Sequence, residues 1–298
     1  MSLQPQTAVL TTIMPGMLNR CATTIPTSRV FSGSGSGSRL REKKLAAAAA
    51  PIEPPMCPVT EAGAAAAEDE PPLDTAFVLL ILNCKKYRSK ALYQKKTWLP
   101  NLPPCIPYYH VIGDPKITTG GPVFDEVNRI LWVHTPDDYV SLPKKVIAAY
   151  AAVVHKMPQI QYIFKTDDDQ ILVNPRFFPV LLNIVTSAIK PHYGGFVVDI
   201  KQAHLSQYHR IHPELPENLP MSQTKYCSGR FYFLSKDAAM NLLTNAPAIR
   251  NEFFEDYAIG KYLSPQLKTH IQHIATNKHF TDIEKTDYCP TSSRKAAK

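Results

Sequence analysis

The fold is indicated most directly by the stretch Tyr162-Ile163-Phe164-Lys165-Thr166-Asp167-Asp168-Asp169-Gln170-Ile171-Leu172-Val173. Its first three residues are aromatic or β-branched, which predicts a short buried strand. Three consecutive carboxylates follow at the point where that strand ends. Open α/β sheets bind ligands at the carboxyl ends of their strands. The stretch therefore predicts a ligand site at the end of a buried strand.

The three carboxylates repel one another, and a hard divalent cation with oxygen ligands is the usual partner of such a group. In an extended chain Asp167 and Asp169 point to one side and Asp168 to the other, which makes a D-x-D pair able to hold one metal ion. A solvated acidic turn is the alternative, and it stays open at this stage. An EF-hand loop is excluded, because positions six and twelve from Asp167 are Leu172 and Phe178 rather than Gly and Glu.

The charge is unevenly distributed along the 298 residues, whose formal net charge is +8. The residues before Leu73 hold six Lys or Arg and six Asp or Glu, so the whole excess lies in residues 73–298. Such an excess favours anionic ligands, for example a nucleoside diphosphate. Without an arginine-rich run or an RNP-type aromatic motif, we expect no nucleic-acid partner.

Three further features bear on the compartment. No apolar run reaches about 18 residues, so no membrane-spanning helix is predicted. The six cysteines show no C-x-x-C spacing, which argues against structural zinc and leaves disulfides open. The sequence has no Asn-x-Ser/Thr sequon, which argues weakly against the secretory lumen.

Composition divides the chain into three parts. Residues 1–72 are low in complexity, with alternating Gly and Ser at 32–38 and two alanine runs, and are expected to be a disordered tail. Their acid-free beginning also resembles an organellar transit peptide, but an unselected tail is favoured. Residues 73–291 are expected to form one domain, and 292–298 a basic tail.

Strands and helices are expected to alternate in residues 73–291, which predicts an α/β fold with a βαβ sheet. Strands are expected at 77–82, 108–112, 130–134, 162–164, 194–198 and 231–234. Helices are expected at 87–98, after a capping Ser141, at 177–189, after a capping Ser235, and through Ile259. Residues 227–229 are expected to form a tight turn, with Gly229 there for close approach to donor or acceptor. The long polar stretch 200–223 is expected to be a flexible acceptor-facing loop, and metal binding by His204, His209 and His212 is the alternative.

Five motifs occur in one order along the chain. They are Lys95-Lys96-Thr97-Trp98, Asp137-Asp138-Tyr139 before Leu142 and Lys145, Lys165-Thr166-Asp167-Asp168-Asp169, Tyr226-Cys227-Ser228-Gly229, and Glu255-Asp256-Tyr257-Ala258-Ile259-Gly260. Over about residues 76–283 this order resembles the family 31 glycosyltransferases, which include β-1,3-galactosyl- and β-1,3-N-acetylglucosaminyltransferases and their Fringe relatives. The chain departs from the family in having Lys95 where Arg is usual and Tyr-Ala-Ile where Val-Tyr-Val is usual.

The resemblance implies a GT-A-type fold, with a mixed, mostly parallel sheet flanked by helices. It also implies a UDP-sugar donor, Mn²⁺ or Mg²⁺, and inversion in a single displacement. Asp169 matches the metal ligand of the family, Asp167 would support the metal or the nucleotide ribose, and His279 can complete the metal site. Asp256 matches the catalytic base, with Glu255 as a possible orienter.

Each of these assignments has an alternative. Asp256 can instead stabilise a helix N-terminus through the dipole, and His279 can be an ordinary surface histidine. Lys165 is expected to pair with an aspartate of the triplet, and Asp168 belongs to the same nucleotide-binding group. Arg88 and Lys95 are candidates for binding the diphosphate, or else part of a solvated helix face.

The function expected from the sequence is transfer of galactose or N-acetylglucosamine from a UDP-hexose to a hydroxyl of a glycan or glycoprotein acceptor, with a β-1,3 linkage. Two alternatives remain: a degenerate transferase that binds nucleotide or glycan without turnover, and a metal-dependent phosphotransferase or nuclease. Without an anchor or sequon, a soluble cytosolic protein is favoured, and the Golgi lumen, where most relatives act, is the alternative.

Overall fold

The central strand of the structure is β1 (Phe77–Leu82), whose six apolar residues are all buried. Successive side chains of a strand point to opposite faces of the sheet. Accordingly, Phe77, Leu79 and Ile81 join one hydrophobic cluster, and Val78, Leu80 and Leu82 join another. An apolar core therefore lies on each side of the sheet, as the unbroken apolar run predicts.

The computed structural model describes residues 75–117 and 121–288, so the expected tails 1–72 and 292–298 lie outside the described residues. Its remaining strands are β2 (Tyr108–Gly113), β3 (Val123–Asp125), β4 (Ile130–Val133), β5 (Tyr162–Asp167), β6 (Gln170–Leu172), β7 (Tyr193–Ile200), β8 (His204–Leu205), β9 (Pro220–Met221), β10 (Thr224–Ser235), β11 (Gln272–His273) and β12 (Phe280–Asp282). Its helices are α1 (Arg88–Thr97), α2 (Leu142–Lys156), α3 (Phe177–Val185), α4 (Lys236–Thr244), α5 (Ala246–Ile249) and α6 (Glu255–Tyr262).

Eight strands form one sheet in the order β11-β7-β10-β5-β1-β2-β4-β3. The strands β5, β1, β2 and β4 are parallel neighbours, and β11 is parallel to β7. Strand β10 pairs antiparallel with β5 and β7, and β3 pairs antiparallel with β4. This mixed, mostly parallel sheet with flanking helices confirms the expected GT-A-type fold class. Two short pairs, β12-β6 and β8-β9, lie outside the sheet.

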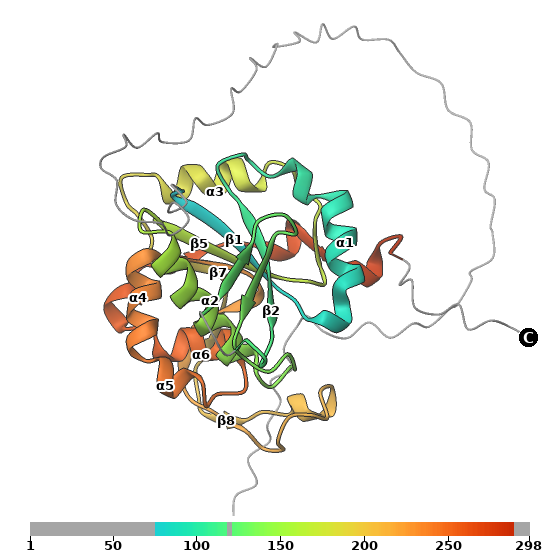
Figure 1. Cartoon of the computed structure of the whole chain (residues 1–298). Helices are drawn as coiled ribbons and strands as arrows, with labels where there is room; N and C mark the ends of the chain where they lie inside the picture. Colours follow the sequence, from blue (N-terminus) through green and yellow to red (C-terminus); the bar gives the residue numbers. More distant parts are fainter. Residues whose placement is uncertain (1–74, 118–120, 289–298) are drawn as a thin grey trace, which may run out of the picture. The chain divides into compact units, whose positions relative to one another are not determined.

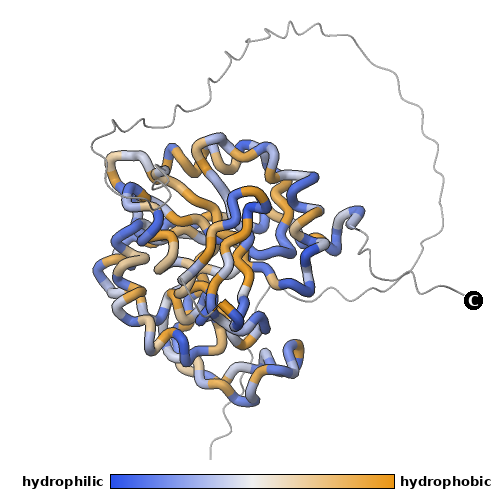
Figure 2. Tube along the Cα trace, viewed as in Figure 1, coloured by the Kyte–Doolittle hydropathy of each residue, from blue (hydrophilic) through white to orange (hydrophobic). Residues whose placement is uncertain are grey.

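The helices cover the two faces of the sheet in two groups (Figure 1). The first group, α1 and α3, covers the face of Phe77, where Trp98 also packs. The second group, formed by α2, α4, α5 and α6, covers the face of Val78. Figure 2 shows that hydrophobic residues follow the central strands between these groups. The two layers leave the carboxyl ends of β5, β1, β2 and β4 at one edge, because these strands run in the same direction.

Several expected boundaries need correction. The chain does not stay extended through the triplet: β5 ends at Asp167, and Asp168 and Asp169 form a turn before β6. Residues 227–229 lie inside β10, where its register with β7 shifts between Cys227 and Tyr232, rather than in a tight turn. The expected helix 177–189 ends at Val185, with Ile189 80% exposed.

One expected helix cap is confirmed and the other is wrong. Ser235 accepts a hydrogen bond from the Ala238 N–H at 3.2 Å. The Ser141 side chain makes no capping bond, and instead the backbone N–H of Ser141 donates to Asp138. The stretch 200–223 also has more structure than expected, because it contains the β8-β9 pair. Within the described ranges, no helix combines the length and the hydropathy needed to cross a membrane.

Candidate functional site

The acidic triplet lies at the carboxyl end of β5, beside the end of β1. Asp167 is the last residue of β5 and pairs in register with Leu82 of β1. The Asp168 N–H donates to the Leu82 carbonyl at 3.1 Å, which starts the turn. Gln170 Nε2 donates to Asp169 Oδ1 at 2.8 Å, and the Ile283 N–H donates to the Asp169 carbonyl at 2.6 Å. The C-terminal segment therefore fixes Asp169 from the far side of the turn.

The buried cation Lys165 joins the triplet to the other acidic motif. Its side chain is 1% exposed, and its Nζ lies 2.8 Å from Asp167 Oδ1 and 2.9 Å from Glu255 Oε2. The same Nζ donates to the Gly229 carbonyl at 2.9 Å. The expected pairing of Lys165 with an aspartate of the triplet is confirmed. One ammonium group thus holds β5, β10 and α6 together.

The acidic residues of α6 stand at its N-terminus, where the helix dipole favours negative charge. Asp256 accepts hydrogen bonds from the Gly229 N–H at 2.9 Å and from the Tyr257 N–H at 2.7 Å. Glu255 Oε1 accepts from the hydroxyl of Tyr232, which in turn contacts the hydroxyl of Tyr150 at 2.6 Å. Glu255 is therefore held inside a buried network, whereas Asp256 lies on its outer side and is partly exposed.

Gly229 brings the two acidic motifs to one place. A Cβ at this glycine would lie 3.4 Å from Asp167 Oδ2 and 3.5 Å from Asp256 Oδ2. In the structure Gly229 lies between these two carboxylates, with Lys165 Nζ 3.3 Å from the same Cβ position. The absence of a side chain here leaves room beside both oxygens, and any larger residue would fill it.

The carboxylates of this site have perturbed acidities. Burial raises the pKa of Asp167 to about 7, against the lowering effect of Lys165 and with the repulsion of Asp169 and Glu255. Burial likewise raises the pKa of Asp168 to about 7, although Lys90 opposes the shift. Burial also raises the pKa of Glu255 and of Asp256, with Lys165 opposing both shifts. Perturbed pKa values of this kind are common at functional sites. The five carboxylates of residues 167–169 and 255–256 face two lysines, Lys90 and Lys165, so the cluster is short of positive charge.

This shortage is compatible with a bound divalent cation. Carboxylate oxygens are hard ligands that suit Mn²⁺ or Mg²⁺. Within residues 75–117 and 121–288, no group of three His, Cys, Asp or Glu side chains has the arrangement of a metal site. An ion bound through one or two carboxylates and the phosphates of a substrate does not need such a group. The residues present therefore fit a metal brought in with a nucleotide.

The other three candidates lie apart from the triplet turn or at its edge. Lys95 Nζ donates to the Asn128 carbonyl, beside the β3-β4 connection. Arg88 is exposed at the first residue of α1. His279 contacts Asn174 Nδ2 through Nδ1 at 2.9 Å and packs against Phe177. Its backbone carbonyl accepts from the Val173 N–H at the end of the β6-β12 pair.

Two residues of α1 that the sequence analysis did not select contact the turn instead. Lys90 Nζ lies 3.6 Å from Asp168 Oδ1 and 3.5 Å from Glu284 Oε1. Gln94 is fully buried and donates to the carbonyls of Asp167 and Gln170. Because Gln94 is a buried polar residue, it needs such hydrogen-bond partners.

A second polar cluster ties together the loops after β1, β2 and β4. Asp137 Oδ1 accepts from Lys145 Nζ at 2.7 Å and from the Gly113 N–H at 2.9 Å, and Asp137 Oδ2 accepts from the Lys85 N–H at 2.7 Å. Lys145, which is 1% exposed, also donates to the Asn83 carbonyl at 2.8 Å. The motif Asp137-Asp138-Tyr139 with Lys145 therefore shapes the strand-end edge next to the triplet.

Aromatic rings from the stretch 200–223 lie near Asp256. His212 stacks on Tyr139, with ring centroids 4.2 Å apart, and on Tyr208 at 5.2 Å. The ring of Tyr208 meets Phe254 edge-on, directly before α6. The negative charge of Asp256 adds to burial in raising the pKa of Tyr208. This aromatic wall, formed by Tyr139, Tyr208, His212 and Phe254, holds the stretch next to the carboxylates.

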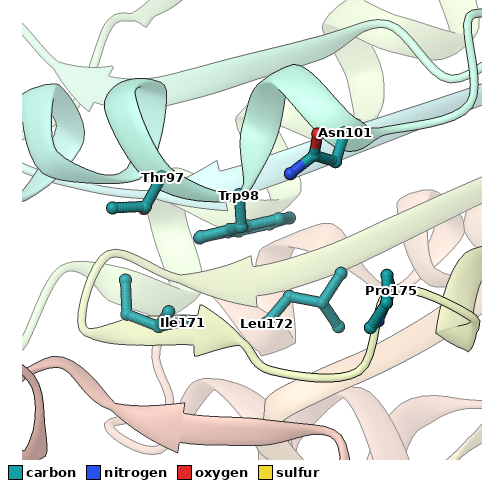
Figure 3. Close-up of a pocket in the computed structure, with 6 residues that line it drawn as sticks. All are labelled: Thr97, Trp98, Asn101, Ile171, Leu172 and Pro175. Atoms are coloured by element: carbon teal, nitrogen blue, oxygen red, sulfur yellow. The ribbon is translucent and has the colours of Figure 1, made fainter.

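A pocket of about 290 Å³ lies between Trp98 and the residues Ile171 and Leu172 of β6 (Figure 3). Thr97, Trp98 and Asn101 form one wall, and Ile171, Leu172 and Pro175 form the other. None of these residues carries a charge. The pocket therefore lacks the ionic groups that a nucleotide diphosphate needs, and we do not assign it to the donor.

The buried cation leads to a prediction about stability. We expect Lys165→Met to lower the free energy of unfolding by about 3–5 kcal/mol, because it leaves the buried Glu255 and the partly exposed Asp167 without their cation. As a control, Lys225→Met removes an exposed pair with Asp199 at 3.7 Å and should cost no more than about 1 kcal/mol. Denaturant unfolding measures both, and equal losses in the two variants would contradict the prediction.

The buried His110 of β2 leads to a prediction about pH. His110 Nδ1 lies 3.4 Å from Asn83 Nδ2, and burial lowers the pKa of this histidine to about 3. In the unfolded chain the pKa is about 6.5, so the unfolded state binds the proton first. Stability is therefore complete above pH 6.5 and falls as the pH decreases toward 3. Between pH 7.5 and 5.0 we expect wild type to lose about 2 kcal/mol more than His110→Leu, and parallel losses would refute this.

Comparison with known proteins places the chain in a family. The model of the galactosyltransferase family matches residues 124–275. This is about half of the chain, and it includes the triplet and Asp256 but neither α1 nor His279. The chain belongs to this family, the family 31 glycosyltransferases.

The similar proteins share only part of their sequence with the chain. The human UDP-GalNAc:β-1,3-N-acetylgalactosaminyltransferase 1 is 28% identical over 155 residues, which are 51% of this chain and 46% of that protein. The pig protein of the same name is 27% identical over 124 residues, 42% of this chain and 37% of its own length. The chain thus spans less than half the length of these relatives.

Solved structures with a similar arrangement include two glycosyltransferases. A glycosyltransferase involved in glycosylation of the major capsid of PBCV-1 has a TM-score of 0.39 and 14% identity, and the match covers 67% of this chain and 81% of that one. The galactosyltransferase LgtC, in complex with donor and acceptor sugar analogs, has a TM-score of 0.38 and 8% identity, with 66% and 72% covered.

Proposed function

We propose that this protein transfers a hexose from a UDP-sugar to a hydroxyl group of a glycan or glycoprotein, with inversion at the anomeric carbon. The observation that supports this most is that Asp167 and Asp256 meet at Gly229. Each contributes a carboxylate oxygen within 3.5 Å of the position that a Cβ of Gly229 would take. Inverting transfer needs a base for the acceptor hydroxyl on one side of the sugar and charge stabilisation of the leaving diphosphate on the other. Two carboxylate motifs on separate elements meet those needs.

The residues divide into two groups by role. Asp169 and Asp167 would hold Mn²⁺ or Mg²⁺, with Asp168 supporting the nucleotide side and His279 as a further candidate ligand. When bound, the ion would stabilise the negative charge of the departing UDP. Asp256 would take the proton of the acceptor hydroxyl. Lys165 and Glu255 would position both groups, since Lys165 contacts the triplet and Glu255 at once.

The donor and the linkage are narrower proposals. The curated relatives are named as β-1,3-N-acetylgalactosaminyltransferases that use UDP-GalNAc. We therefore add N-acetylgalactosamine to galactose and N-acetylglucosamine as candidate sugars, and propose a β-1,3 linkage. The aromatic wall formed by Tyr139, Tyr208, His212 and Phe254 borders Asp256, and this supports binding of the acceptor on that side.

The first experiment is titration of UDP into the full chain by calorimetry, with and without Mn²⁺, followed by turnover assays with UDP-Gal, UDP-GlcNAc and UDP-GalNAc. Manganese-dependent binding and release of UDP from one of these sugars would support the transferase. Binding of UDP without turnover of any sugar, with a panel of glycan acceptors present, would instead indicate a binding module. Absence of UDP binding in every condition would refute the proposal.

The compartment is a separate proposal. Cys105 is disulfide-bonded, while Cys84 and Cys227 are free thiols. Structural disulfides form and persist in oxidising compartments, so we propose the lumen of the secretory pathway rather than the cytosol. Peptide mapping of the protein purified from its native cells without reductant tests this, and a free Cys105 thiol would refute it.

A further inference from the structure

Gln94 stands directly behind the acidic turn. It lies on α1, outside the part of the chain that matches the family, and it is fully buried. Its Nε2 donates to the Asp167 carbonyl at 3.1 Å and to the Gln170 carbonyl at 2.8 Å. Both partners are carbonyl oxygens, so only the amide nitrogen of Gln94 can face them. The two carbonyls bracket Asp168 and Asp169, so a single side chain spans the whole turn.

The turn depends on such support because it leaves the sheet. The main ladder of β5 ends at Asp167, and Gln170 begins the pairing with β12. The carbonyls of Asp167 and Gln170, one at each end of the turn, face Gln94 of α1. A buried carbonyl without a hydrogen-bond donor costs about 1–3 kcal/mol. Gln94 supplies both donors from a rigid helix. A polar group on a helix therefore fixes the distance between the end of β5 and the start of β6.

The same contacts reach the carboxylate of Asp169. Gln94 holds the backbone of Gln170, and the side chain of Gln170 donates to Asp169 Oδ1 at 2.8 Å. Gln170 Nε2 also lies 3.3 Å from Asp282 Oδ1, which Arg230 Nη2 contacts at 2.7 Å. The position of Asp169 is thus set through Gln170 by α1 on one side and by the C-terminal segment on the other.

We propose that Gln94 is a positioning residue for the reaction: it sets the separation of Asp167 and Asp169 and so the affinity for a metal-nucleotide complex. This rests on the proposed function. Groups that orient metal ligands from behind commonly change affinity about 10- to 100-fold when removed. If Gln94 had a purely structural role, its removal would lower the stability of the fold but leave the turn and the affinity for UDP unchanged.

The chain offers a matched control for this distinction. Asn245, at the start of α5, also donates from one side-chain amide to two carbonyls, Asn241 at 3.3 Å and Tyr262 at 3.2 Å. Tyr262 ends α6, at the opposite end from Glu255 and Asp256. Asn245→Leu therefore removes the same kind of bonds at a place that does not contact the turn. Gln94→Met removes the donors of Gln94 while keeping a side chain of similar length.

The test uses three measurements on wild type, Gln94→Met and Asn245→Leu. The first is stability in denaturant, the second is amide exchange of residues 163–173 without metal, and the third is UDP binding with Mn²⁺. We expect both variants to lose stability, but only Gln94→Met to exchange faster in 163–173 and to bind UDP about 10- to 100-fold more weakly. Unchanged exchange and binding in Gln94→Met would overturn the inference.

A second variant covers the case in which Gln94→Met does not fold. Gln94→Asn keeps the amide, but it is one methylene shorter and can reach only one of the two carbonyls. We expect faster exchange and weaker UDP binding than in wild type, and wild-type values for both would overturn the inference. If wild type itself binds no UDP, the proposed function fails, while the exchange measurement still decides whether Gln94 fixes the turn.

Discussion

Asp169→Ala is expected to abolish manganese-dependent binding of UDP. Asp169 follows the end of β5, and its Oδ1 and its carbonyl are held by Gln170 Nε2 and the Ile283 N–H. The substitution keeps the backbone contact and removes only the carboxylate. A metal contact of this kind is worth several kcal/mol, so UDP affinity in Mn²⁺ should fall at least about 100-fold, and turnover of the sugar nucleotide should fall with it.

The stability of the Asp169→Ala variant separates loss of a ligand from loss of structure. The pKa values of Asp167 and Asp168 are both raised, mainly by burial and in part by the charge of Asp169. Removing that charge relieves repulsion, so the free energy of unfolding should not decrease. Asp237→Ala, at an exposed carboxylate in the first turn of α4, is the control and should bind UDP as wild type does. Manganese-dependent UDP binding that survives in Asp169→Ala would remove Asp169 from the metal site.

The sequence predicted the sheet well because its strands are buried on both faces. Continuous apolar runs such as 77–82 carry that information locally, and the strand ends then place the acidic triplet at the edge where ligands bind. The boundaries that were wrong have a common cause. The turn at Asp168 and Asp169 and the shift in β10 depend on pairing with β12 and β7, which are distant in sequence.

The site was predicted in part for the same reason. The pairing of Lys165 with the triplet follows from adjacent residues, whereas its contact with Glu255 joins positions 90 residues apart. Lys90 and Gln94 were missed because helix α1 carries many polar residues, and nothing local shows which of them face inward. Arg88 and Lys95 were selected as candidates for binding the diphosphate, but Lys95 contacts Asn128 and Arg88 is exposed. A contact across the fold therefore decides which polar residue of a helix serves the site.

Asp256→Asn is expected to abolish transfer while largely sparing UDP binding. The carboxylate accepts the N–H groups of Gly229 and Tyr257, and an amide oxygen can retain one of these bonds. An amide cannot take a proton from the acceptor hydroxyl at neutral pH. Loss of a general base typically costs about 10²–10⁴-fold in rate, so kcat should fall by this amount while the affinity for UDP with Mn²⁺ changes less than about tenfold. Glu252→Gln is the control, because it makes the same chemical change at a carboxylate that binds Lys261 and Tyr262 instead.

The neighbouring Glu255 shows why the base is assigned to Asp256. Both oxygens of Glu255 are engaged, one by the hydroxyl of Tyr232 and the other by Lys165 at 2.9 Å, and its side chain is 6% exposed. A carboxylate held in this way can orient its neighbours but cannot approach an acceptor hydroxyl. Asp256, by contrast, has backbone partners on one side and the aromatic wall on the other. If Asp256→Asn transferred sugar at the wild-type rate, with UDP binding intact, Asp256 could not be the base. Because Glu255 is already engaged, the base of the inverting mechanism would then have to come from an element other than α6.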